Sequence, residues 1–386
     1  MTETAISAVL CTLGFALFLW KACFLFLRAK RFRYMASLSP QQDALRLYKL
    51  TNFVEFGFLS EKGLEFALFK SLAIPSISIL LHATNLLSPT NIPKRHDDTR
   101  ILMEEFALHH VDSRRGSRAI QRLNFIHGHY KISNDDYLYT LSLFTVEPIR
   151  FSNKYGYRKL SEGEKQAQFM VWHDIGVRMG IKNIPESLEE MDRFSRQYEA
   201  SYMVYSKSNK VVGDNTVDLF LSKVPAFLWP LAKRAFYALC EERLLDAMGY
   251  PRQPFWFVWI VENIAKFCCG TFVRWFLPPR PVNWSTVRIP LEEDEEEEGD
   301  EDEDEKVYKL RYHLYKPWTY PNGYKISKMG AAPGGRMGKV AEGLVLCPVL
   351  YTKKIYLKEE EGGKVWTVIL WDCSLLYNLY VIISNK

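Results

Sequence analysis

Two apolar stretches stand out near the start of the chain. Residues 5–27 are apolar except for Lys21, and at about 1.5 Å per helical residue they are long enough to cross a hydrocarbon core of about 30 Å. Residues 64–87 form the second stretch, which Pro75 divides and Lys70 interrupts. We expect the first stretch to be a transmembrane anchor and the second to form two buried helical segments or one kinked helix.

Helical periodicity continues through the middle of the chain. Ser187 is a natural N-cap with Glu190 at the capping-box position, residues 134–136 are expected to cap the helix that follows them, and Pro148 is expected to close it. No convincing alternation typical of strands occurs before residue 280, so the pattern predicts an all-α, multi-helix globular body. Apolar residues recur at helical spacing within 101–108, 118–130, 137–146, 161–179, 187–202, 217–248 and 256–277.

The chain changes character again after the helical body. Thirteen of the residues from Leu291 to Glu305 are acidic, and such a run is expected to be a disordered insert, with an interaction tail as the alternative. Residues 340–386 are β-branched and aromatic and would form a small hairpin or lie outside the ordered fold. The predicted organisation is a tail at 1–4, the anchor at 5–27, a basic juxtamembrane linker at 28–42, the all-α domain at 43–281, a linker at 282–311 and a C-terminal tail of uncertain structure at 312–386.

Composition and charge favour a membrane-associated protein. Hydrophobic residues make up 48% of the chain and aromatic residues 14%, which indicates a membrane-facing surface or a large apolar interior. The net charge of +5 includes the acidic run, so the remainder is basic and suits anionic lipid. Zinc-ligand spacings and aromatic-glycine RNA signatures are absent from the sequence, so nucleic acid is not an expected partner. Seven cysteines without a CxxC pair fit reduced thiols in the cytosol.

Basic residues flank the anchor on one side only. Arg28, Lys30, Arg31 and Arg33 follow it, whereas the residues before it carry only Glu3. The positive-inside rule therefore predicts a single-pass protein whose body faces the cytosol. Because no basic region precedes the apolar run and no clear cleavage site follows it, a retained anchor is favoured over a removed signal peptide.

One histidine in the helical body is a candidate ligand. Ile120, Leu123 and His127 are spaced i, i+3 and i+7, so on a helix they share the face that points into the core, while His129 faces roughly the opposite way. An inward histidine flanked by arginines could bind a metal or a haem. Spacing alone leaves open a core histidine that is hydrogen-bonded to a neighbour.

Several short motifs, in a specific order and spacing, resemble one known family. It comprises the fungal ER-bound oxygenases of the MpaB type, which are related to the bacterial latex-clearing protein, or rubber oxygenase. The resemblance covers about residues 43–281. The motifs are Ile-Pro-Ser-Ile-Ser at 74–78, Arg95-x-x-x-Thr99, Arg-Leu-Asn-Phe-Ile-His at 122–127, the run from Ile132 to Phe144, Glu-Pro-Ile-Arg at 147–150 and Trp172-x-x-Ile-Gly-x-x-Met-Gly-Ile.

The resemblance implies a haem site. Rubber oxygenases are all-α and bind a b-type haem through a histidine about thirty residues after an Arg-x-x-x-Thr pair. Here the pair is Arg95 and Thr99, and the implied iron ligand is His127, with His129 as the alternative. Arg95 would pair with a haem propionate or polarise bound dioxygen, and Thr99 would donate a hydrogen bond to the same oxygen.

Two features temper this assignment. From the residues alone, Arg95 could simply pair with Asp97 or Asp98. Rubber oxygenases also place a catalytic glutamate upstream of the arginine, yet no acidic residue occurs between Phe66 and His96. A catalytic base must therefore come from elsewhere, or the activated haem needs none.

Together these observations predict a membrane-anchored, haem-dependent oxygenase, an oxidoreductase. It would use dioxygen to cleave a C=C bond in a polyprenyl or terpenoid side chain at the endoplasmic reticulum membrane. A lipophilic isoprenoid partitions into the bilayer, which suits an anchored enzyme. The alternatives are a non-catalytic, membrane-anchored lipid-binding or scaffold protein, and a hydroxylase or non-haem iron enzyme on the same helical fold. The sequence specifies neither protein partners nor the particular isoprenoid.

Overall fold

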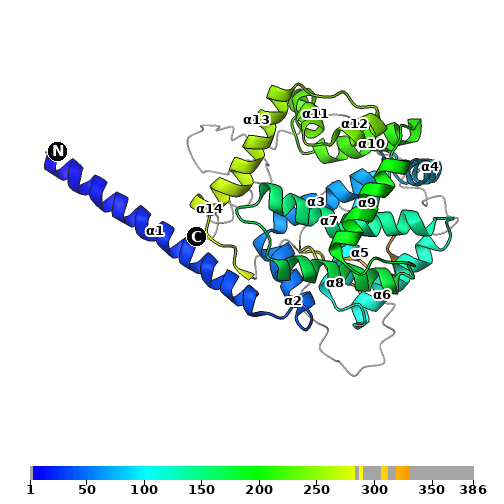
Figure 1. Ribbon diagram of the computed structural model, residues 1–386, viewed down its shortest axis with the longest axis horizontal. Helices are drawn as coiled ribbons and strands as arrows, with labels where there is room; N and C mark the ends of the chain where they lie inside the picture. The colour runs from blue at the N-terminus through cyan, green and yellow to red at the C-terminus, as the bar shows by residue number, and fades with distance from the viewer. Residues whose placement is uncertain (1–2, 283–286, 290–305, 312–318, 331–386) are drawn as a thin grey trace, which may run out of the picture.

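The computed structural model describes residues 3–282, 287–289, 306–311 and 319–330. Within these residues the chain is helical and has no strand beyond an isolated antiparallel bridge, which confirms the predicted all-α fold. The elements of Figure 1 are α1 (Glu3–Ser37), α2 (Ala44–Lys49), the π-helix η1 (Leu50–Glu55), α3 (Gly57–Ser71), α4 (Pro75–Ala83), α5 (Ile92–Leu108), α6 (Arg114–His127), α7 (Asn134–Tyr155), α8 (Glu162–Arg178), α9 (Leu188–Tyr202), α10 (Lys207–Leu221), η2 (Ala226–Leu228), α11 (Trp229–Ala238), α12 (Glu242–Met248), α13 (Phe255–Lys266), the π-helix η3 (Phe267–Phe272), α14 (Val273–Phe276) and η6 (Ile326–Lys328).

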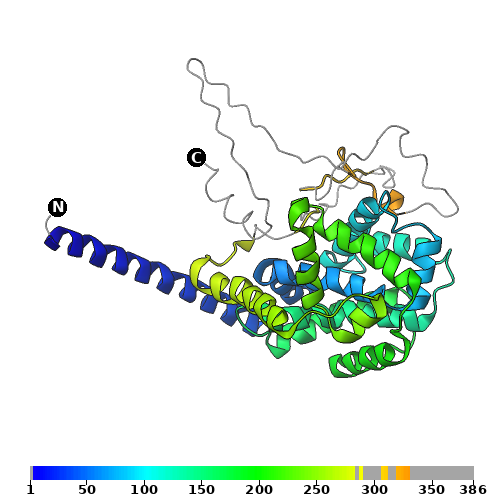
Figure 2. The same cartoon turned by 90° about the horizontal axis from the view of Figure 1, so that it is seen from above.

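Helix α1 projects from a body of packed helices (Figures 1 and 2). The stretch Leu10–Ser37 is long and apolar enough to cross a membrane, as the sequence predicted for the N-terminal helix. The helix also continues through basic residues that were expected to form a linker, and it ends at Ser37. By length and composition Phe255–Phe276 could cross a membrane too, as could α3 and α4 if the two are counted as one bent span.

A sharp bend separates α3 from α4. The helix axes meet at 89°, and Pro75 begins α4, as its fixed φ and missing N–H favour. Helix α3 packs along α7, and Phe66, Phe69 and Lys70 are buried there. The second apolar stretch therefore forms two helical segments, as predicted. Only α3 is buried in the body, whereas Ser78 is the one buried residue of α4, so the prediction that both segments are buried is wrong for α4.

Helix α7 continues through Pro148, so the prediction that this proline ends the helix is wrong. Proline has no N–H to donate to the carbonyl of residue i−4, which is Phe144. The side-chain amide of Gln168 on α8 donates to that carbonyl instead, at 3.1 Å. Gly63 on α3 leaves room for the ring, because a Cβ there would lie 2.7 Å from Pro148 Cα. Tertiary contacts thus sustain a helix that the local sequence would end.

The helix ends show which capping predictions hold. Ser187 caps α9 as predicted, since its hydroxyl accepts from the N–H of Glu190. The cap of α7 is Ser133 and not residues 134–136, because the Ser133 hydroxyl accepts from the N–H of Asp136 at 3.0 Å. The helical stretch expected over 217–248 is broken into the end of α10, then η2, α11 and α12, with Pro225 at the start of η2.

Residues after Pro281 help to form the core. Val287, Ile289, Tyr324 and Met329 are buried in the hydrophobic cluster that includes side chains of α5, α6 and α8. Helix α5 is therefore covered in part by residues that were expected to belong to a linker or a tail. The acidic run at 291–305 and the possible hairpin at 340–386 lie outside the described residues.

Candidate active site around helix α5

Helix α5 is highly charged and yet largely buried. Pro93 lies in its first turn, where the missing N–H carries no penalty. Burial of charged groups is costly unless they are paired, so the partners of these side chains indicate the role of each face of the helix. The buried carboxylates of α5 are Asp97, Asp98, Glu104 and Glu105, and its basic side chains include Lys94, Arg95, His96 and Arg100.

On one face of α5, Arg95 and Thr99 form a local pair. The Arg95 guanidinium donates from Nη1 to Thr99 Oγ1 at 2.7 Å, and the Thr99 hydroxyl donates to the Arg95 carbonyl at 2.8 Å. Burial lowers the pKa of Arg95, and the nearby carboxylate of Asp98 only partly offsets this. Among the described residues no carboxylate lies within ion-pair distance of Arg95, in contrast to the expected alternative of a salt bridge. Arg95 is therefore an enclosed cation with a neutral partner.

His127 lies near this pair at the C-terminal end of α6. Its Nδ1 is buried and has no hydrogen-bond partner in the described part of the chain, and its ring centroid lies 5.6 Å from that of Tyr137. Burial and then the charge of Arg95 lower the pKa of His127 to about 4, so the ring is neutral at pH 7. A neutral imidazole is the form that binds a metal.

His129 differs from His127 in its surroundings. It follows the end of α6, its side chain is exposed, and its Nδ1 lies 2.7 Å from the Phe125 carbonyl oxygen. The structure thus brings Arg95, Thr99 and His127 into one region and leaves the alternative ligand at the surface. The roles of these residues remain predictions.

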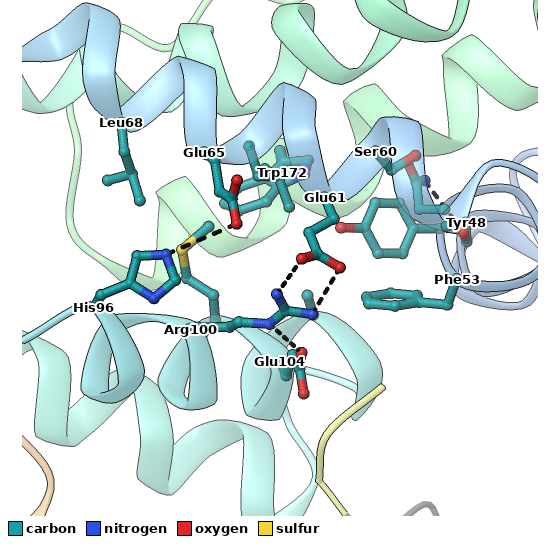
Figure 3. A pocket seen from close by; sticks show the side chains of 15 residues that line it. Tyr48, Phe53, Ser60, Glu61, Glu65, Leu68, His96, Arg100, Glu104 and Trp172 are labelled. Atoms are coloured by element: carbon teal, nitrogen blue, oxygen red, sulfur yellow. Dashed lines mark hydrogen bonds and ion pairs between the residues drawn. The ribbon is translucent and has the colours of Figure 1, made fainter. Parts of the chain in front are cut away.

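A small cavity of about 60 Å³ lies on a different face of α5, between α5, α3 and η1 (Figure 3). His96 and Arg100 point into this region from α5, and Glu61 and Glu65 point into it from α3. The other walls are mostly apolar, so the polar groups meet in a site with little water. The remaining side chains that line it include Tyr48, Phe53, Leu64, Leu68, Met103 and Trp172.

Arg100 is paired with two carboxylates in this site. Its Nη1 lies 2.6 Å from Glu61 Oε1, and its Nε donates to Glu104 Oε1 at 2.9 Å. Burial opposes ionisation of Glu61, but the charges of Arg100 and Lys62 outweigh burial and hold the pKa of that carboxyl at about 2. The two carboxylates and the guanidinium therefore form a buried ionic network that joins α3 to α5.

His96 and Glu65 form a second contact across the cavity. Nε2 of His96 lies 3.8 Å from Glu65 Oε1, and burial followed by the charge of Arg100 lowers the pKa of His96 to about 3. Glu65 was not predicted from the sequence, because it lies just before the stretch from Phe66 to His96, which contains no acidic residue, and 30 positions before Arg95. The signal that could have revealed this site is a pair of i, i+4 motifs, Glu61-x-x-x-Glu65 and His96-x-x-x-Arg100.

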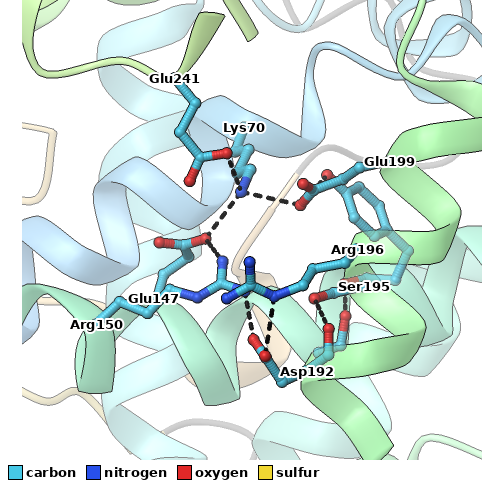
Figure 4. Close-up of polar contacts among 10 residues, drawn as sticks. Lys70, Glu147, Arg150, Asp192, Ser195, Arg196, Glu199 and Glu241 are labelled. Carbon is cyan, nitrogen blue, oxygen red and sulfur yellow. Dashed lines mark hydrogen bonds and ion pairs between the residues drawn. The ribbon is translucent and has the colours of Figure 1, made fainter. Parts of the chain in front are cut away.

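A separate ionic cluster surrounds Lys70 of α3 (Figure 4). The Lys70 Nζ lies 2.9 Å from Glu199, 3.1 Å from Glu147 and 3.6 Å from Glu241, and Arg150 also pairs with Glu147. These contacts join α3, α7, α9 and the start of α12. Because the cation has several carboxylate partners, we assign this cluster a role in holding the helices together.

The donors fit a haem better than a non-haem iron. No group of three or more His, Cys, Asp and Glu side chains within the described residues is arranged to hold a metal ion. A non-haem iron takes several protein ligands, whereas a haem iron can take a single histidine. His127 is neutral, its Nδ1 has no hydrogen-bond partner in the described structure, and the nearby Arg95 has no carboxylate partner. These features match a haem, whose iron can take a single histidine.

Comparison with known proteins gives consistent matches. Residues 108–267 match the family model of the catalytic domain of "ER-bound oxygenase mpaB/B'/Rubber oxygenase". The chain is 32% identical over 280 residues to the ER-bound oxygenase mpaB' of Penicillium brevicompactum, a match that covers 67% of this chain and 65% of that protein. It is 33% identical over 233 residues to the ER-bound oxygenase mpaB of Penicillium roqueforti, covering 56% of this chain and 78% of the relative.

Proposed function

Because the chain belongs to the family of ER-bound oxygenases and rubber oxygenases, we propose that it is a membrane-anchored, haem-dependent oxygenase with His127 as the iron ligand. The observation that carries this proposal is the buried Nδ1 of His127, which has no hydrogen-bond partner in the described structure. A polar atom in this position has lost its interaction with water and has gained none from the protein, so it can accept a ligand without breaking an existing hydrogen bond.

The other residues of this region would position the cofactor. Arg95 can pair with a carboxylate such as a haem propionate, and its lack of a carboxylate partner leaves its charge available. Thr99 holds the guanidinium through the 2.7 Å hydrogen bond. When bound, the haem supplies the activation of dioxygen. Burial around His127, together with the charge of Arg95, keeps its ring neutral.

The proposed reaction is oxidative cleavage of a C=C bond in a polyprenyl or terpenoid side chain. The double bond breaks, and each carbon receives one oxygen atom of O₂, so two carbonyl fragments form and no external reductant is required. An isoprenoid dissolved in the bilayer would reach an enzyme anchored by α1 without first entering water. The proposed location is the endoplasmic reticulum membrane, with the body in the cytosol.

An absorption spectrum tests haem binding. The full-length chain should be purified in detergent after expression with added haem, because residues beyond Pro281 pack in the core. We expect a Soret band that disappears in His127→Ala and persists in His129→Ala. A colourless wild-type protein that is correctly folded by circular dichroism would overturn the proposal in favour of a lipid-binding or scaffold protein. Loss of the band only in His129→Ala would overturn the choice of ligand.

Product analysis tests the reaction. The haem-loaded chain should be incubated with ¹⁸O₂ and a farnesyl-bearing aromatic compound, and the products identified by mass spectrometry. We expect two shortened carbonyl fragments, each with one ¹⁸O atom. A product of unchanged carbon number with one added oxygen would instead identify a hydroxylase.

A further inference from the structure

The segment from α13 to α14 has an exposed apolar face. Trp256, Trp259, Ile264 and Phe267 recur at helical spacing, and between 54% and 60% of each side chain is exposed. Tryptophan side chains are enriched where a protein meets the interface of a bilayer. An exposed aromatic face of this extent is unusual in water and marks a surface that is covered by something else.

The opposite face of this segment rests on the body. Lys154 of α7 pairs with Glu262 of α13 at 2.6 Å. Ala265 and Cys269 pack against the cluster that contains Tyr155, and Gly270 permits this close approach, since a Cβ there would lie 3.2 Å from the Tyr155 carbonyl oxygen. The segment therefore packs against the body on one face and exposes apolar side chains on the other.

The end of α14 is attached to α1. Arg28 of α1 donates to the carbonyl oxygens of Val273 and Leu277, both at 2.9 Å. Lys21 of α1 lies over the rings of Trp275 and Phe276, with its Nζ 5.7 Å and 5.8 Å from their centroids. These contacts fall at the basic end of the apolar stretch in α1, where the anchor is expected to leave the membrane. The exposed aromatic face is thus continuous with the anchor.

The chain returns to the body immediately after α14. Arg31 of α1 donates to the carbonyl of Arg280 at 2.6 Å, and the backbone N–H of Arg288 donates to Glu104 of α5 at 2.7 Å. Before the segment, Arg234 of α11 donates to the side chain of Gln253 at 2.9 Å. The chain thus contacts the body both before and after the α13–α14 segment. Figure 1 also shows α13 running along the edge of the body while α1 projects away from it. This arrangement favours a segment that stays on one side of the membrane over the second span that its length and composition would allow.

We propose that the α13–α14 segment lies in the plane of the bilayer interface and forms a second membrane attachment beside α1. Its aromatic face, defined by Trp256, Trp259, Ile264 and Phe267, would enter the headgroup and upper acyl region of phospholipids. Two attachments fix the orientation of the body relative to the bilayer, which a single helical anchor cannot do. The proposal concerns the position of the protein and holds whether or not haem is bound.

Lipid cross-linking tests the position of the aromatic face. Benzoylphenylalanine should be introduced at Trp259 or Ile264 in the full chain in microsomal membranes, with Phe18 of α1 as the positive control and the exposed Val204 of the body as the negative control. After irradiation we expect phospholipid adducts at 259, 264 and 18 but not at 204. Adducts at 18 alone, or adducts of 259 and 264 with another protein, would overturn the proposal.

Thiol labelling tests whether the segment lies in the plane. Gln253→Cys and Val282→Cys place a thiol before and after the segment, and a membrane-impermeant maleimide is added outside sealed microsomes. The native chain gives the background from its own cysteines. We expect labelling above background at both positions. Labelling of one position, with the other labelled only after the membrane is opened by detergent, would show a transmembrane span and overturn the proposal.

Discussion

Arg95 and Arg100 lie five positions apart on helix α5, and their side chains have different partners. Arg100 is paired with Glu61 and Glu104, so its charge is neutralised by the protein itself. Arg95 donates to Thr99 and has no carboxylate within ion-pair distance among the described residues. A protein that buries a cation without neutralising it leaves that charge available for another molecule. The comparison therefore separates a structural face from a candidate functional face on one helix.

The largest expected effect is on stability, from Arg100→Met. Removal of the guanidinium leaves the buried Glu104 without this cation and leaves the partly buried Glu61 with only Lys62 at 3.7 Å, which should lower the free energy of unfolding by about 3 kcal/mol. The measurement is thermal and urea denaturation of the full chain in detergent. In the double variant Arg100→Met/Glu61→Gln, one of the stranded charges is gone and part of the loss should be recovered. A single variant as stable as the wild type would show that the network contributes nothing.

The second effect depends on pH and involves His96 on the structural face. Its pKa in the folded protein is about 3, below the ordinary value of 6.5, so the unfolded chain binds the proton more readily. The stability from the neutral ring is fully present above about pH 6.5 and is lost as the pH falls toward 3.

Between pH 6.5 and 5.0 this group alone should cost about 1.6 kcal/mol of unfolding free energy, because the loss approaches about 1.4 kcal/mol per pH unit only below the pKa of the unfolded histidine. Denaturation at the two pH values in wild type and His96→Gln measures the difference, and the variant should lose less stability on acidification. The exposed His129→Gln is the matched control. Identical pH dependence in wild type and His96→Gln would contradict the assignment of a buried neutral ring.

The smallest expected effect on stability is that of Arg95→Met, which shares a helix and a substitution with Arg100→Met. No ion pair is broken, and the lost hydrogen bond to Thr99 is offset by removal of a buried charge, so the free energy of unfolding should change by less than about 1 kcal/mol. Haem occupancy, measured from the Soret band per protein, should nevertheless fall. If Arg95→Met unfolded as readily as Arg100→Met and kept its haem, the two faces would have the opposite roles.

The sequence predicted the helical body because caps, proline positions and apolar spacing are local signals. Ser187 shows this well, since the cap depends on residues within four positions of one another. Pro148 shows the limit, because Gln168 and Gly63 lie far from it in sequence and alone explain how α7 continues. Periodicity also placed His127 on the inner side of its helix and His129 outside, which agrees with their burial.

The cavity side of α5 could not be derived in the same way. Glu65 and His96 belong to different helices, and their meeting depends on how α3 packs against α5. The contact between Arg288 and α5 could not be predicted from the sequence either. Its carboxylate partner Asp97 is 191 positions away, and an acidic run lies much closer to Arg288 in the sequence. Local patterns report on single elements, whereas the buried ionic network is a property of their assembly.

The late segments that cover α5 also affect the order in which the protein can be completed during its synthesis. Thr319 donates to Asp97 across 222 positions, and Arg288 donates to Glu104 across 184. The ribosome makes α1 before the carboxylates of α5, and it makes these carboxylates long before their partners. The contacts that cover the carboxylates of α5 can therefore form only after residues 288 and 319 have been made, when α1 already exists.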